Sequence, residues 1–123
     1  MGIDLKRAVE QVSRDYFGGT LHPHVRWGKA PARAQKAGKF ILAYFENSLY
    51  RITLHPMFKS PRVPRGIVLY LLYHEMLHIT WGGPRHSAGF REAERAHPDY
   101  WRAEKWLSNN ICSLSLECGK RNG

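Results

Sequence analysis

The sequence predicts an α+β fold built as one domain, and three features of the chain support this prediction. An amphipathic helical pattern comes first, two short segments rich in aromatic and β-branched residues follow, and a strongly apolar helical segment comes after them. The 123 residues are 43% hydrophobic, which suffices for one core and falls short of two. We therefore expect an N-terminal helix, a small antiparallel sheet, a buried helix and C-terminal helices over residues 1–110, with a tail over residues 111–123.

The N-terminal helix is predicted over residues 5–17. Four residues recur there at spacings of three and four and so share one apolar face: Leu5, Val9, Val12 and Tyr16. Gly18 and Gly19 are expected to end the helix, because glycine readily adopts the left-handed conformation that often follows a helix C-terminus. Residues 21–27 are then predicted to form a short extended segment.

A β-hairpin is predicted next. Residues 40–46 and 49–54 are dense in aromatic and β-branched side chains, and Asn47-Ser48 between them is typical of a turn. His55-Pro56 follows the second strand and should end its hydrogen bonding, since proline lacks a backbone donor. This hairpin is the basis of the predicted antiparallel sheet.

Ser60-Pro61 and Pro64 are predicted to mark the entry of the buried helix, which should end at about Trp81, where a Gly-Gly-Pro sequence at 82–84 breaks it. Its apolar residues surround the axis instead of forming one stripe: Ile67, Val68, Leu69, Leu71, Leu72, Met76, Leu77 and Ile79. This distribution is typical of a helix that is buried on most sides.

Two helices are predicted after this break. Ser87 could cap a helix that extends through His97, and Pro98-Asp99 opens another that ends near Ser108. The sequence beyond Asn110 is weakly patterned. Three large aromatic residues of this region are expected in the core: Phe90, Trp101 and Trp106.

The formal net charge of +9 is unevenly distributed. From Tyr16 to His74 there are nine lysines and arginines against the single acid Glu46. A basic region of this kind, from Arg26 to Arg65, could attract phosphates, DNA or acidic polypeptides, and it could equally serve to keep a small protein soluble.

Membrane insertion is not expected. The longest apolar run, residues 67–73, is much shorter than the roughly 20 residues that a membrane span needs. The first residues lack the order of a secretory signal, so we expect a cytoplasmic setting. Cys112 and Cys118 are too few for a disulfide framework and are expected to be free thiols.

The strongest motif lies within the buried helix, where His74-Glu75-Met76-Leu77-His78 has the form H-E-x-x-H. At 3.6 residues per turn, His74 and His78 point to nearly the same side, which lets both imidazoles reach one metal ion. Glu75 projects about 100° away from His74, where it can flank an open coordination position. Burying three such side chains would be costly unless they were paired or bound a metal.

A catalytic zinc ion needs a third protein ligand and an exchangeable water. His86 is the best candidate because it follows His78 by eight residues, directly after the 82–84 break that can reverse the chain. Glu92 and Glu94 are weaker alternatives as a carboxylate ligand. With zinc bound, Glu75 could take a proton from the acidified water as it attacks a peptide carbonyl, and later pass that proton to the leaving amine.

Several other residues have weaker functional interpretations. His97 and Asp99 could orient a ligand imidazole, although Asp99 also fits a helix cap. Tyr73 and Tyr100 could stabilise an oxyanion, but tyrosines at helical spacing usually pack. Three histidines are expected at the surface or at strand ends rather than at the metal: His22, His24 and His55.

Further along, the H-E-x-x-H helix is followed by His86-Ser87-Ala88-Gly89-Phe90, and Pro98-Asp99-Tyr100 and Trp106-Leu107 come later. With Arg26-Trp27-Gly28 upstream, these motifs resemble the YgjP-like and WLM metallopeptidases and, more distantly, the SprT-like (Spartan) group. In those families a histidine opens an H-S/G-x-x-F pattern after the zinc helix. Three departures are that Lys29-Ala30 replaces the usual Ser-Cys, that the loop to Gly38 is long, and that Cys112 and Cys118 do not make a four-cysteine zinc ribbon.

The resemblance implies a minimal zincin-like domain with His86 as the third zinc ligand and a polypeptide as substrate. Since SprT-like and WLM proteins include proteases that degrade proteins crosslinked to DNA, it also raises DNA-associated proteins as a substrate class. Two alternatives from other classes stay open: a zinc-stabilised nucleic-acid-binding module without catalysis, and a metal-dependent hydrolase of a non-peptide amide. Neither the oligomeric state nor the natural substrate follows from the sequence.

Overall fold

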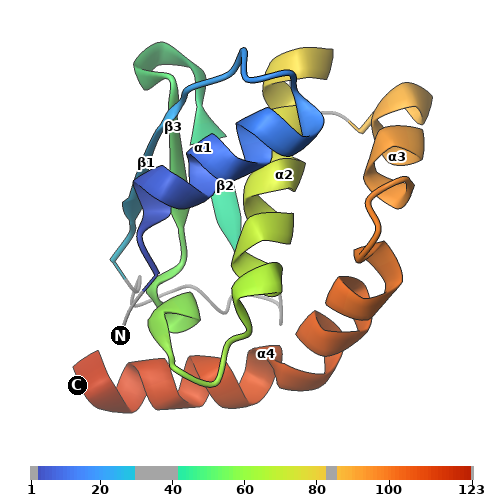
Figure 1. The fold of residues 1–123 in the computed structure, drawn as a ribbon. Coiled ribbons are helices and arrows are strands. Elements are labelled where there is room, and N and C mark those ends of the chain that lie inside the picture. Colours follow the sequence, from blue (N-terminus) through green and yellow to red (C-terminus); the bar gives the residue numbers. More distant parts are fainter. Residues whose placement is uncertain (1–2, 30–41, 83–85, 123) are drawn as a thin grey trace.

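A computed structural model describes residues 3–29, 42–82 and 86–122, with side chains through Glu117. Within these ranges the fold is α+β, as predicted, with helices around a small sheet (Figure 1). In chain order the helices and strands are α1 (Leu5–Tyr16), β1 (His24–Trp27), β2 (Ala43–Glu46), β3 (Arg51–Leu54), α2 (Arg65–Trp81), α3 (Ala88–Arg95) and α4 (Tyr100–Asn122). Two short 3-10 helices, η2 (Asn47–Leu49) and η3 (Pro56–Lys59), flank β3.

Helix α1 is close to the predicted helix. Asp4 caps it, because the carboxylate accepts a hydrogen bond from the backbone N–H of Arg7. Gly18 and Gly19 follow its end with positive φ angles of 61° and 72°, as their sequence position predicts. The predicted apolar face is buried up to Val12, whereas Tyr16 is partly exposed. The helix therefore packs one face against α2 and β1.

The sheet has the strand order β1-β3-β2, with β3 in the centre. Strands β2 and β3 pair antiparallel, which confirms the predicted hairpin, although residues 40 and 41 lie outside the described part of the chain. The expectation of a purely antiparallel sheet is wrong, because β1 pairs parallel with β3. Strands β1 and β2 thus lie on opposite sides of β3, and the sheet is mixed.

The connection between β2 and β3 differs from the predicted two-residue turn. It is the 3-10 helix η2, and the next residue, Tyr50, has a φ of 47° in the left-handed region. In β3, Ile52, Thr53 and Leu54 are all buried, so this central strand is covered on both faces.

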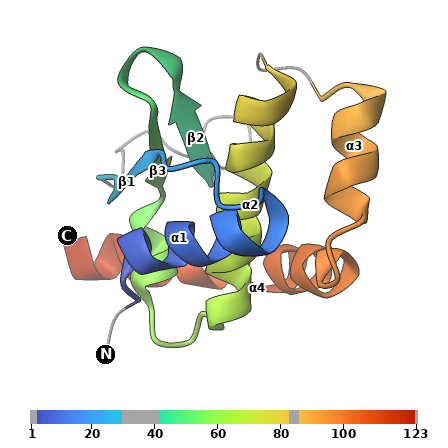
Figure 2. The same cartoon turned by 45° about the horizontal axis from the view of Figure 1, so that its top comes forward.

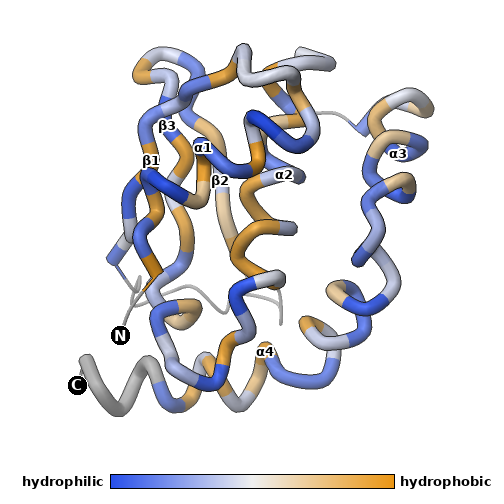
Figure 3. Tube along the Cα trace, in the orientation of Figure 1, coloured by the Kyte–Doolittle hydropathy of each residue, from blue (hydrophilic) through white to orange (hydrophobic). Residues whose placement is uncertain are grey.

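Helix α2 begins at Arg65, after Ser60-Pro61 and directly after Pro64 of the predicted entry, and it ends at Trp81 as predicted. It stands between the sheet and α3 in two views (Figures 1 and 2). It carries long hydrophobic stretches, whereas α3 is mostly hydrophilic (Figure 3). Contacts with α1, β2, α3 and α4 bury it on most sides, as predicted. Among the described residues, no helix has both the length and the apolar character needed to cross a membrane.

The C-terminal part departs most from prediction. Ser87 caps α3, as expected, by accepting a hydrogen bond from the N–H of Phe90, but α3 ends at Arg95. The predicted end of the last helix near Ser108 is wrong, because α4 continues to Asn122 and the boundary expected after residue 110 lies inside it. Leu114, in the expected tail, is fully buried in the core.

Among the three aromatic residues predicted in the core, Phe90 is fully buried and Trp106 is partly buried against the core. Trp101 is 76% exposed, so its prediction as a core residue is wrong. It lies in the first turn of α4.

Truncating Leu114 should destabilise the fold, although the sequence places this residue in a tail. Leu114→Ala removes a fully buried side chain from α4 and should cost about 2–5 kcal/mol of unfolding free energy. Leu116→Ala, in the same helix turn, is the matched control, since Leu116 is 66% exposed and its truncation should cost less than about 0.5 kcal/mol. Urea denaturation measures both; equal effects would show that the end of α4 is not part of the core.

Candidate metal centre

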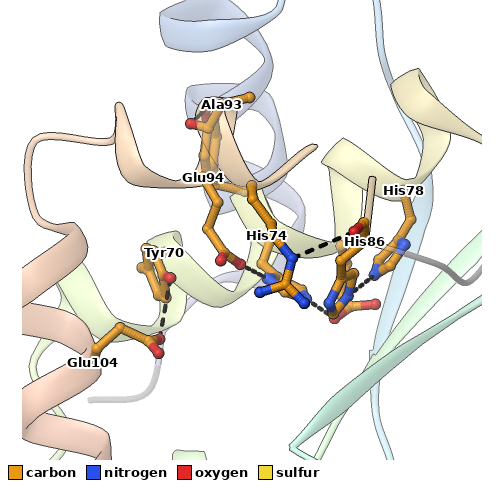
Figure 4. Close-up of polar contacts among 10 residues, drawn as sticks. Tyr70, His74, His78, His86, Ala93, Glu94 and Glu104 are labelled. Carbon is orange, nitrogen blue, oxygen red and sulfur yellow. Dashed lines mark hydrogen bonds and ion pairs between the residues drawn. The ribbon is translucent and has the colours of Figure 1, made fainter. Parts of the chain in front are cut away.

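Three histidines converge beside α2. His74 and His78 lie one turn apart on the helix, and their ring centroids are 5.2 Å apart. His86 comes from the segment before α3, and its ring lies 5.1 Å from that of His74 and 5.0 Å from that of His78. Figure 4 shows the three side chains turned toward one another. The structure therefore brings together the three residues that the sequence predicted as ligands.

The nitrogen atoms of this cluster fit a metal ion. One ring nitrogen from each histidine lies within 4.8 Å of the other two. The Nε2 atoms of His78 and His86 are 3.3 Å apart, and two tetrahedral zinc ligands with Zn–N bonds of about 2.0–2.1 Å are separated by about the same distance. Three neutral imidazoles leave a fourth tetrahedral position for water or substrate, which is typical of catalytic rather than structural zinc.

Phe90 forms the apolar support of the cluster. Its ring stacks on His86 with centroids 4.6 Å apart and an interplanar angle of 20°. It also lies 4.6 Å from the ring of His78 and 5.2 Å from that of His74. Since Phe90 is fully buried, one residue of α3 contacts all three candidate ligands and limits the directions in which they can turn.

Glu75 lies next to the ligands without being one of them. Its side chain is buried, and its Oε2 atom is 3.9 Å from His74 Nε2. Burial raises the pKa of this carboxyl to about 7, although the charge of His74 opposes the shift. A carboxyl group with this pKa can both accept and return a proton near neutral pH.

The sequence did not identify the partner of His74. Glu94 of α3 forms a hydrogen bond with His74 Nδ1 (Figure 4), which leaves Nε2 for a metal. Burial acts to lower the pKa of His74, but the hydrogen bond and the charges of Glu75 and Glu94 outweigh it, so the net shift is upward. Glu94 was predicted only as an alternative third ligand, and nothing in the local sequence marks it as a partner of a residue 20 positions away.

The weaker interpretation of His97 and Asp99 as residues that orient a ligand imidazole gains no support from the structure. His97 Nδ1 accepts a hydrogen bond from the backbone N–H of Asp99, and the His97 ring packs 4.9 Å from the rings of both Tyr16 and Tyr73. Tyr73 cannot serve as an oxyanion donor in this arrangement either, because its hydroxyl donates to the carbonyl of Ala93 at 2.6 Å. These side chains attach α3 to α1 and α2.

Three other histidines lie away from the candidate metal cluster: His22, His24 and His55. His22 bonds to the carbonyl oxygen of Gly19, and His55 accepts from the N–H of Met57 at the start of η3. His24 lies exposed on β1. Their predicted placement at the surface or at strand ends, away from the cluster, is confirmed.

An open cleft of about 500 Å³ gives access to the histidines. Ala43, Tyr44 and Phe45 of β2 line one side, and residues of α2 and the His86 segment line the other. Asn47 of η2 also reaches the cleft. The sequence predicted the hairpin but gave no signal that its first strand borders the metal cluster, since this depends on how the sheet packs against α2.

Three of the six described cations of the basic region form ion pairs. Arg26 and Arg51 contact the Oε1 atom of Glu46 at 3.6 and 2.9 Å, and Arg62 contacts Glu117 at 3.1 Å. Arg65 donates to the side chain of Gln11. Three cations lie outside the described residues: Arg33, Lys36 and Lys39. The described part of this region therefore gives no support to DNA binding.

No protein-family model matches the chain, and no curated protein matches its sequence. Solved structures do match its fold. The metallopeptidase zymogen of Pyrococcus abyssi abylysin aligns over 88% of this chain and 96% of its own, with a TM-score of 0.64 and 20% identity. The metallopeptidase zymogen of Methanocaldococcus jannaschii jannalysin aligns over 98% of this chain and 92% of its own, with a TM-score of 0.60 and 13% identity. The predicted small zincin-like fold is thus confirmed, while membership of the YgjP-like, WLM or SprT-like families stays a prediction.

Neutralising Glu94 should weaken metal binding without removing a ligand. Glu94→Gln keeps the side-chain size but removes the charge beside His74 Nδ1, so zinc affinity should fall by about 10- to 100-fold. Glu92 is an exposed residue of the same helix, so Glu92→Gln should leave the zinc affinity unchanged. Competition with a chromophoric chelator measures both constants. A Glu94 variant that binds zinc as tightly as the parent would show that this contact does not support the site.

Proposed function

We propose that this chain is a zinc-dependent metallopeptidase in which His74, His78 and His86 hold the metal and Glu75 is the general base. One observation carries the proposal: three imidazoles and a buried carboxyl group meet at an open cleft bordered by a sheet strand. The likeness to the two metallopeptidase zymogens in fold is consistent with it. We place the chain near the YgjP-like, WLM and SprT-like enzymes on the motif around His86.

Zinc is the metal that suits this donor set best. Imidazole nitrogen also accepts copper, nickel and iron, but a set of three histidines with a free fourth position is a common arrangement of hydrolytic zinc. When bound, zinc supplies Lewis acidity, which acidifies water and polarises a carbonyl group.

Glu75 is suited to move protons in this cleft. Its carboxyl group is close enough to His74 to border the metal position, yet it lies on a different side of α2 and leaves the ligand set to the histidines. It would accept a proton from the attacking water at a side-chain oxygen, hold it in a water-poor environment, and return it to the amine that leaves as the peptide bond breaks.

Strand β2 supports the proposal that the substrate is an extended polypeptide. The N–H of His55 donates to the carbonyl of Leu42, so in this antiparallel register the next bonded position on β2 is Tyr44, opposite Thr53. The backbone groups of Ala43 and Phe45 then point to the free edge of β2 in the described sheet. These groups border the cleft and can pair with an added strand.

The other functions considered from the sequence are less well supported. A structural zinc module needs neither a buried carboxyl group beside the ligands nor an open cleft, and both are present. A small non-peptide amide would not use the free edge of β2. DNA-associated proteins as substrates rest on the family resemblance alone, because Arg26, Arg51 and Arg62 of the basic region form ion pairs within the chain.

Substitutions should separate metal binding from turnover. His78→Ala removes a ligand and should abolish both stoichiometric zinc and peptide hydrolysis. Glu75→Gln keeps all three imidazoles and should retain zinc while lowering kcat by at least about 100-fold, since general-base catalysis contributes this much or more. Elemental analysis and a casein or autolysis assay, with and without chelator, measure the two properties.

His24→Ala is the matched control, because His24 is exposed on β1 and lies outside the cluster. It should leave zinc content and activity unchanged. Full zinc in the His78 variant would contradict the ligand assignment, and full activity in the Glu75 variant would favour a non-catalytic site.

Removing an outward backbone donor from β2 should weaken substrate binding. Ala43→Pro deletes an N–H that points to the free edge, where proline is tolerated, and loses a hydrogen bond worth about 0.5–1.5 kcal/mol. We expect KM for a peptide substrate to rise about two- to tenfold with zinc content unchanged. Ala43→Val, which retains the N–H, should have a KM close to that of the parent. Equal KM values for both variants and the parent would show that the substrate does not pair with this strand.

A further inference from the structure

Trp81 and Gly89 make an unusually close contact across the break between α2 and α3. Trp81 is the last residue of α2, and Gly89 lies in the first turn of α3. A Cβ atom at position 89 would lie only 2.7 Å from the Cη2 and Cζ3 atoms of the Trp81 ring. The indole can therefore cover this turn only because residue 89 has no side chain.

This contact spans the segment that carries His86. Residue 86 lies between Trp81 and Gly89 in the chain, and unlike His74 it is not held by a helix. Its side chain is exposed, and the backbone carbonyl of His86 accepts a long hydrogen bond of 3.4 Å from Arg91 Nε. The position of its imidazole must therefore be set mainly by the placement of the first turn of α3.

Other contacts hold α3 farther from His86. The Tyr73 hydroxyl anchors the carbonyl of Ala93, and Glu94 bonds to His74, both in the second half of the helix. At the end near His86, Phe90 packs beneath the rings while Trp81 packs on Gly89. Trp81 is otherwise half exposed at the end of its helix, so this contact is a reason for a large aromatic side chain there.

We propose that Trp81 and Gly89 are a positioning pair that holds the first turn of α3 against α2 and so delivers His86 to the metal. The inference rests on the metal site of the proposed function and goes beyond it by assigning a role to two residues that touch neither metal nor substrate. If the pair is broken, His74 and His78 stay on their helix while His86 moves away, and a three-histidine site becomes a two-histidine site.

Gly89→Ala tests the pair with a minimal change. The added methyl group would overlap the indole, so the Trp81 ring or the first turn of α3 must shift. Zinc affinity, measured by chelator competition, should fall about 10- to 100-fold, as it does when groups that orient ligands are lost. Gly66→Ala is the matched control, because it is also a glycine in a first helical turn but its added Cβ meets nothing within 4 Å. It should bind zinc within about twofold of the parent, since only helix propensity changes.

A double-mutant cycle tests whether the two residues act through one contact. Trp81→Ala alone should weaken zinc binding like Gly89→Ala, and the double variant should be no weaker than the more affected single variant, because both changes remove the same interaction. Trp81→Phe in the Gly89→Ala background makes room for the methyl group and should recover part of the affinity. If the loss of zinc affinity in the double variant equalled the product of the two single losses, the two residues would act independently and the proposal would be overturned.

The visible spectrum of bound Co²⁺ reports the ligand set directly, since it depends on the number and geometry of ligands. The spectrum of Gly89→Ala should shift toward that of His86→Ala, whereas the Gly66→Ala spectrum should match the parent. Suppose that the parent binds zinc and cleaves peptides, and that Gly89→Ala has the same zinc affinity and Co²⁺ spectrum as the parent. This result would overturn the role proposed for Trp81 and Gly89 and leave the metallopeptidase proposal intact. A parent that binds no zinc would overturn the metallopeptidase proposal and this inference with it.

Discussion

The burial of α2 is the constraint on which the rest of the structure depends. This helix must be surrounded by α1, the sheet, α3 and α4 and still present ionisable side chains to one open cleft. Burying such groups without partners costs several kcal/mol each, and each of them has a compensating contact here. Glu94 pairs with His74, and Glu75 lies beside the same imidazole. Because packing fixes α2 in position and rotation, the directions of His74 and His78 are fixed before any metal binds.

The parts of the site that could be predicted from the sequence are those that depend on local geometry. His74 and His78 share a side because four residues nearly complete one helical turn, and Glu75 is displaced from them for the same reason. The hairpin of β2 and β3 was predictable because two neighbouring strands joined by a short connection pair antiparallel, whereas parallel strands need a long crossover. His86 could be predicted as the third candidate ligand because a helix break lies just before it and because it begins a sequence pattern that resembles the one in the YgjP-like and WLM metallopeptidases.

The features that the sequence could not predict depend on contacts between distant elements. Glu94 becomes the partner of His74 only after α3 docks on α2, and no local pattern encodes that docking. Strand β1 pairs parallel with β3, a segment more than 20 residues away in the sequence, and no local pattern encodes that pairing. In the second half of α4, Leu107, Ile111 and Leu114 lie at helical spacings of four and three and face the core. The serines and asparagines among them have low helix propensity and mask this stripe, and packing against η3 and α2 stabilises the helix.

The candidate ligands differ in how firmly the protein holds them, and this difference has a thermodynamic consequence. Two come from a helix fixed by the core, while the third comes from an exposed segment that is placed through α3. A metal held by all three would link α2 to α3, so part of its binding free energy would go into holding α3 in place. Some contacts hold α3 on α2 without a metal, such as Phe90 beneath the imidazole rings and the Tyr73 hydroxyl on the carbonyl of Ala93. They reduce the share of the metal-binding free energy that would be spent on holding α3. The affinity of this cluster for a metal would therefore depend on the packing of a mostly hydrophilic helix as well as on the three imidazoles.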